Sequence, residues 1–136
     1  MEILWNELNI LSENRNIIYI NHPSVVEAKN NLSKQIKLIE PVNYFDIVYL
    51  IENCSGVISD SGGMQEEVLS ANKNILICRD TTERPETIDS GFGKLVNTEI
   101  EDNLNFLFEK NNQNIKNPYG ENVSQKITSI LEKEYL

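Results

Sequence analysis

The chain has 136 residues, 40% of them hydrophobic, and a formal net charge of −9. This length and composition indicate one globular domain with its own core, and an acidic chain without a Lys/Arg cluster excludes a general nucleic-acid or anionic-membrane surface. No apolar run reaches membrane-spanning length, and Cys54 and Cys78, without CxxC or Cys/His spacing, are expected to be reduced core thiols of a cytoplasmic protein.

Apolar runs alternate with amphipathic stretches along the whole chain. The expected elements are, in order, a helix over 2–13, a strand over 17–20, a helix capped by Ser24 to about Leu32, a strand over 36–39, a helix capped by Asn43 with Asp46 in a capping box, a strand over 56–59, a helix to about Asn72, a strand over 74–78, a short helix from Pro85, a strand over 93–96, a helix over 100–108, an Asn-rich connection over 111–117 and a last helix from about Glu121.

This alternation predicts an α/β fold. No hairpin signal separates the strands, so we expect a doubly wound parallel sheet of about five strands, with right-handed crossovers and helices on both faces. Ligands of such sheets bind beyond the carboxyl ends of the strands. Here those ends lead into the loops that contain His22, Pro41, Ser61 and Arg79.

The stretch from Val57 to Glu67 predicts a phosphate site. A buried strand leads into Ser61-Gly62-Gly63, where small residues let the backbone turn sharply and approach a ligand closely, and a helix follows. The unpaired N–H groups and the positive dipole end of a helix start suit a phosphate. Glu67, one turn further on, lies within reach of two ribose hydroxyls. The alternative is that Asp60 and Ser61 cap a helix after an ordinary βα turn.

Three segments resemble one family. Asp60–Glu67 (DSGGMQEE), Arg79–Glu86 (RDTTERPE) and Asn117–Gly120 (NPYG) are similar in sequence, order and spacing to motifs of the non-hydrolysing UDP-N-acetylglucosamine 2-epimerases. The resemblance runs from about residue 17 to the C-terminus. It implies a Rossmann-like domain that forms one half of a GT-B fold, so that residues 1–136 would be a single nucleotide-binding domain, the C-terminal half of a two-domain epimerase.

The resemblance also implies which residues bind the nucleotide. Ser61, Gly62 and Gly63 lie where the family binds the phosphates, and Glu67 matches the glutamate that binds the ribose. Arg84 matches an arginine of the substrate site, and its guanidinium is suited to a diphosphate.

Other residues near the predicted site have structural alternatives. For Arg84 the alternative is a surface salt bridge with Glu83 or Glu86. Asp80, Thr81 and Thr82 are expected to shape the loop rather than to contact substrate.

The sequence departs from the family where the base would bind. Pro41, Val42 and Ile47 form a possible base pocket, but many members have glutamine in place of Val42 and phenylalanine in place of Ile47, so weaker uracil recognition is expected. His22, the only histidine, is interpreted as a solvated or loop-capping residue, because Ile20 holds the place of the family histidine. No metal site and no cofactor are predicted.

The family reaction eliminates UDP across C1–C2 of the sugar and re-adds it after inversion. Its proposed proton-transfer acids lie in the N-terminal domain, so the expected partners are UDP or UDP-GlcNAc and an N-terminal epimerase domain in the same or another chain. The isolated chain is expected to be inactive. Two other classes stay open: a non-catalytic nucleotide-sugar-binding module, and the donor domain of a GT-B glycosyltransferase. The family further implies a cytoplasmic isomerase of cell-surface polysaccharide biosynthesis.

Overall fold

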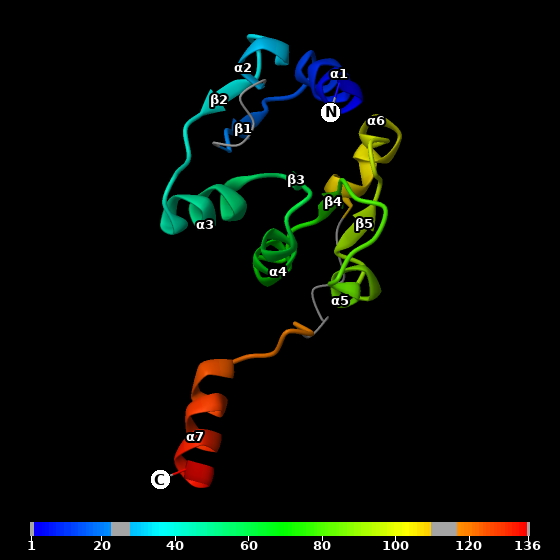
Figure 1. Cartoon of the computed structure of the whole chain (residues 1–136). Coiled ribbons are helices and arrows are strands. Elements are labelled where there is room, and N and C mark those ends of the chain that lie inside the picture. The colour runs from blue at the N-terminus through cyan, green and yellow to red at the C-terminus, as the bar shows by residue number, and fades with distance from the viewer. Residues whose placement is uncertain (1, 23–27, 110–116, 136) are drawn as a thin grey trace.

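The computed structural model describes residues 2–22, 28–109 and 117–135 (Figure 1). Helices and strands alternate over this part of the chain, as the sequence predicts. The elements are α1 (Glu2–Ser12), β1 (Ile18–Ile20), α2 (Ala28–Asn31), β2 (Lys37–Ile39), α3 (Tyr44–Asn53), β3 (Val57–Ser59), α4 (Gly62–Ser70), β4 (Ile75–Ile77), α5 (Pro85–Asp89), β5 (Gly93–Leu95), α6 (Ile100–Asn103), the 3-10 helix η1 (Leu104–Phe108) and α7 (Val123–Tyr135). The cap predicted at Ser24 and the connection over 111–116 lie outside the described residues.

All strand pairs of the described chain are parallel, and the strands fall into two ladders. β1 pairs with β2, while β4 lies between β3 and β5. Parallel pairing places the loops after β3 and β4 at the same edge of one sheet, which is where the candidate phosphate turn and the Arg79–Arg84 loop begin. The predicted parallel α/β fold is thus confirmed, and its five strands are divided between two ladders.

Helices cover both faces of the three-stranded sheet. β4 is fully buried and its side chains alternate: Leu76 faces one core with α1 and α6, and Ile75 and Ile77 face the other with α3 and α4. The first core consists of Trp5, Leu8, Leu11, Ile36, Leu76, Val96, Ile100 and Leu107. The second consists of Ile51, Val68, Ile75 and Ile77, with Ile47, Val57, Met64, Ala71 and Ile88 against it. The doubly wound arrangement follows from this alternation.

Side chains cap two helices, one as the sequence predicts and one from a distant residue that the sequence did not indicate. Asn43 caps α3 as predicted, since its side chain accepts from the N–H of Asp46 at 3.1 Å, but the return bond joins the Asn43 amide to the Asp46 carboxylate rather than to a backbone N–H. α6 is capped from a distance: one carboxylate oxygen of Glu7 on α1 accepts from the N–H groups of Ile100 and Glu101 at 3.1 and 2.8 Å.

The single helix predicted over 100–108 is wrong. The chain forms the short helix α6 and then η1, with Ile100 and Leu107 buried. Apolar spacing over so few residues does not separate an α-helical turn from a 3-10 turn, because both place residues three apart on the same side.

The C-terminal helix α7 stands apart from the other elements in Figure 1. It begins at Val123, and every residue of it that the structure describes is exposed. Its predicted apolar stripe is present on one side and uncovered, with Val123, Ile127, Ile130 and Leu131 between 45% and 59% exposed. In the described part of the chain, no helix is long and apolar enough to cross a membrane.

Candidate nucleotide-phosphate site

The glycine turn joins β3 to the start of α4. Ser61 is the N-cap, with extended backbone angles, and its hydroxyl accepts from the N–H of Met64 at 3.5 Å. The capping role considered for Ser61 is therefore confirmed, and it does not compete with ligand binding by the backbone. The first N–H groups of an α-helix have no acceptor within the helix, so those of Gly62 and Gly63 are directed out of its start. A Cβ at Gly63 would have no neighbour within 4 Å, so the turn is open at that residue.

A buried glutamine connects the turn to the next loop. Gln65, on α4, is fully buried, and its side-chain amide donates to the carbonyl of Ser61 at 3.5 Å. The hydroxyl of Thr82 donates to Gln65 Oε1 at 2.7 Å and accepts from the backbone N–H of Arg84 at 3.0 Å. The side chain of Thr82 thus fixes the backbone of Arg84 relative to the start of α4, in agreement with the loop-shaping role predicted for it.

Two ion pairs lie beside the turn. Arg79 Nη1 donates to Glu83 Oε2 at 2.7 Å, and Arg84 Nε donates to a carboxylate oxygen of Glu66. The bond to Glu66 raises the pKa of Arg84, which stays charged. The salt bridge considered for Arg84 exists, but its partner is not the predicted Glu83 or Glu86: Glu66 lies one helical turn after Gly62 and faces the loop.

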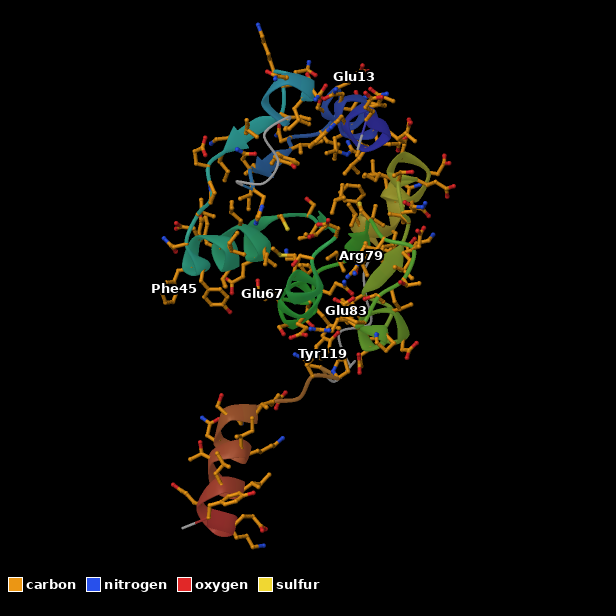
Figure 2. The ribbon with its side chains drawn as sticks, viewed as in Figure 1. Glu13, Phe45, Glu67, Arg79, Glu83 and Tyr119 are labelled. Carbon is orange, nitrogen blue, oxygen red and sulfur yellow. The ribbon has the colours of Figure 1, made fainter. Side chains whose placement is uncertain are left out.

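The Asn117–Gly120 turn joins the same region. The hydroxyl of Tyr119 lies 2.6 Å from that of Thr87 on α5, and the Asn117 side chain donates to Ser70 Oγ at 3.1 Å. Figure 2 shows Arg79, Glu83 and Tyr119 around the α4 and α5 region, with Glu67 on α4. The Asn117–Gly120 turn thus contacts α4 and α5, the two helices that begin within the other segments of the family resemblance.

The other predicted residues lie at the edge of this region. Ile47, on α3, packs against the second core, as Met64 at the start of α4 does. In the loop before α3, Pro41 is exposed and Val42 is half-buried. Glu67 is half-buried. His22 is exposed, two residues after the end of β1. The described residues contain no group of three or more His, Cys, Asp or Glu placed to hold a metal ion.

Both cysteines are free, as predicted, but they are half-buried rather than fully buried. Burial, reinforced by the charge of Asp60, raises the pKa of Cys78 to about 11. Burial likewise raises the pKa of Cys54, whose thiol donates to the carbonyl of Ile51 at 3.2 Å.

Sequence reasoning missed Gln65 and Glu66. One signal was present for Gln65: it stands directly beside Met64 and three residues before Val68, at a core-facing position of the helix, where a polar side chain needs a buried partner. No pattern in the sequence pairs Glu66 with an arginine eighteen residues away.

The sequence of this chain matches known proteins over most of its length. Residues 2–132 match the family model described as UDP-N-acetylglucosamine 2-epimerase. The chain belongs to the UDP-N-acetylglucosamine 2-epimerase family. Among its relatives, the UDP-N-acetylglucosamine 2-epimerase of Salmonella borreze is 39% identical over 112 residues, and a probable UDP-N-acetylglucosamine 2-epimerase of Ralstonia solanacearum is 37% identical over 130 residues.

Solved epimerase structures share the fold. The Methanocaldococcus jannaschii UDP-GlcNAc 2-epimerase in complex with UDP-GlcNAc and UDP superposes with a TM-score of 0.80 at 33% identity, and the Neisseria meningitidis enzyme bound to UDP-GlcNAc with 0.76 at 30%. The Methanocaldococcus match covers 97% of this chain and 39% of the solved chain, and the Neisseria match covers 98% and 41%. The Salmonella alignment covers 75% of this chain and 29% of the relative, and the Ralstonia alignment covers 85% and 35%. The chain is thus a Rossmann-like part of a GT-B fold and spans well under half of its relatives.

Proposed function

We propose that this chain binds the UDP part of UDP-N-acetylglucosamine and forms the C-terminal, nucleotide-binding domain of a UDP-N-acetylglucosamine 2-epimerase. One observation carries the proposal: the glycine turn and the Arg84 loop follow neighbouring parallel strands and are joined through Gln65 and Thr82. The Asn117–Gly120 turn contacts α4 and α5, the helices that follow them. In this proposal the N–H groups at Ser61–Gly63 and the Arg84 guanidinium bind the diphosphate, and Glu67 accepts from the ribose hydroxyls.

The base is proposed to lie near Pro41, Val42 and Ile47. Ile47, which packs against the second core from α3, would give the base an apolar contact and looser recognition than an aromatic ring gives. Binding requires no metal or cofactor in this proposal.

Epimerisation is proposed to need the rest of a two-domain protein, in the same or another chain. Small-molecule sites are usually concave, whereas Ser61 and Gly63 are exposed and a Cβ at Gly63 would have no neighbour within 4 Å. The phosphate turn is thus open at Gly63, where a second domain could close it. The exposed apolar stripe of α7 supports the same proposal, because a second domain could cover it. A cytoplasmic location and a role in cell-surface polysaccharide biosynthesis are also proposed, on family resemblance alone.

The diphosphate assignment is tested with Arg84→Lys. A lysine keeps the charge but cannot reproduce the two-pronged guanidinium contact, so affinity for UDP should fall by about tenfold or more while affinity for uridine stays unchanged. Calorimetric titration of both ligands gives the comparison. Arg15→Lys, in the exposed loop before β1, is the matched control and should change neither affinity. Equal losses for UDP and uridine would assign Arg84 a loop-bracing role only.

The ribose assignment is tested with Glu67→Ala. Loss of charge-assisted hydrogen bonds should weaken UDP and uridine alike, by roughly 1.5–3 kcal/mol. Glu52→Ala, an exposed acid on α3, is the control. The parent chain should show no interconversion of UDP-GlcNAc and UDP-ManNAc above background, and detectable turnover would show that it contains the proton-transfer groups.

A further inference from the structure

The carboxylate of Glu83 lies over the glycine turn. A Cβ added at Gly62 would approach Glu83 Oε1 to 2.5 Å and Glu83 Cδ to 3.4 Å, with Arg84 Cζ 4.0 Å away. Space that a side chain at the first residue of α4 would occupy is therefore filled by the carboxylate of another loop. This is the side of the turn that also faces the guanidinium of Arg84.

Glu83 is held there as an anion. Its Oε2 accepts from Arg79 Nη1 at 2.7 Å. The pKa of Glu83 lies below its usual value, chiefly because a backbone N–H bonds to its carboxylate and further because of the charges of Arg79 and Arg84. A negative group at the start of a helix is stabilised by the helix dipole, as a phosphate would be. The carboxylate is therefore an anion that lies against the first residue of α4, next to the proposed phosphate position.

We propose that Glu83 is an internal competitor for the phosphate-binding turn, which a nucleotide diphosphate must displace in order to bind. This inference rests on the proposed function, since it concerns the same turn. In this structure the carboxylate occupies the space over Gly62. When a diphosphate enters, Glu83 swings into solvent and its departure frees Arg79, which becomes a second cation near the phosphates.

The exchange is energetically feasible. Glu83 and Arg79 are half-exposed, and ion pairs in contact with water contribute little to stability, so breaking this one costs little. A diphosphate brings more negative charge than a carboxylate and offers oxygens that two arginines can bind in pairs. A ligand without phosphate, such as uridine, has no group to place over Gly62 and does not need to move Glu83.

The test compares E83Q with E86Q in the 136-residue chain. Both variants remove one negative charge from the same loop and helix, and Glu86 is exposed on α5. UDP and uridine are titrated by calorimetry at low ionic strength, where charge effects are least screened. Because E83Q removes a like charge from the phosphate position, it should bind UDP about tenfold more tightly than the parent and uridine equally well. E86Q should bind both ligands within about twofold of the parent, since its charge does not lie over the turn.

The outcomes separate this inference from the proposed function. If the parent binds UDP and E83Q binds it no more tightly than E86Q does, Glu83 does not compete and only the inference fails. Weaker UDP binding by E83Q would likewise overturn it and would make Glu83 a residue that positions the arginines. If the parent and both variants are folded by circular dichroism and none binds UDP, the proposed function fails and the inference with it.

Discussion

The hydroxyl of Thr82 is the most sharply testable structural feature of the site. It donates to the buried Gln65 side chain at 2.7 Å and accepts from the Arg84 N–H at 3.0 Å. Thr82→Val keeps the shape of the side chain and removes both bonds. Gln65 Oε1 then faces an apolar methyl group in a fully buried position, and the Arg84 backbone loses its connection to α4.

The expected cost follows from these two bonds. An unsatisfied buried acceptor costs about 1–3 kcal/mol, and a bond in contact with water costs less, since water replaces it. Thr82 is half-buried, so water can reach the Arg84 N–H and the Gln65 contact dominates. We expect Thr82→Val to lower the free energy of unfolding by about 1–2 kcal/mol, measured by urea denaturation. UDP affinity should fall as well, because Arg84 is no longer held beside the turn.

Two comparisons make this prediction specific. Thr81→Val, at the exposed neighbouring residue, should change the free energy of unfolding by less than about 0.5 kcal/mol. The double variant Gln65→Met with Thr82→Val should recover part of the loss, because replacing both partners of a hydrogen bond by apolar groups of similar shape is nearly neutral. Equal stabilities for Thr82→Val and Thr81→Val would show that Gln65 does not depend on the Thr82 hydroxyl.

Three further predictions concern other parts of the fold. Glu7→Ala removes the cap of α6 and should lower the free energy of unfolding by about 1 kcal/mol in urea denaturation, whereas an unchanged midpoint would show that water caps α6 equally well. Because the pKa of Cys78 is about 11, little of its thiol is ionised at pH 8. In a Cys54→Ser variant, iodoacetamide should therefore modify Cys78 slowly until the chain is unfolded in urea. Fast modification of the folded chain would contradict the raised pKa. Ile130→Ser should leave the thermal midpoint unchanged, because the stripe of α7 is exposed; a lowered midpoint would mean that α7 packs on the chain.

The sequence predicts the fold because the relevant signals are local. Alternating apolar runs and amphipathic stretches fix the order of elements, and Pro85 and Ser61 mark two helix starts that the structure confirms. The wrong prediction of a single helix over 100–108 has a local cause as well. In an α-helical turn and in a 3-10 turn alike, residues three apart lie on the same side, so a short apolar pattern does not distinguish them. The division of the strands into two ladders depends on how closely β1 approaches β3, which no local pattern encodes.

The sequence likewise predicts one part of the candidate site and not the other. The glycine turn and the Arg84 loop are visible as motifs, because their residue types are adjacent in sequence. The partners of their side chains are not, because the Glu66 carboxylate, the Thr82 hydroxyl and the Gln65 amide meet only after β3, α4 and β4 have packed. The ion pair considered as an alternative role for Arg84 therefore exists, but with Glu66 rather than with either glutamate that the sequence suggested.

The ion pairs of Arg79 and Arg84 also bear on how an acidic chain could bind an anionic ligand. With a net charge of −9, this chain repels an anion such as UDP at long range, so the proposed binding does not depend on long-range attraction. Arg79 and Arg84 are each matched by a glutamate before any ligand binds, which leaves this cluster locally neutral. Affinity for a diphosphate must then come from exchange at short range, in which phosphate oxygens replace carboxylate oxygens on guanidinium groups and bind the N–H groups at the start of α4. The proposed site would therefore select ligands by the number and geometry of their phosphate oxygens rather than by charge alone, as the proposed binding of UDP requires.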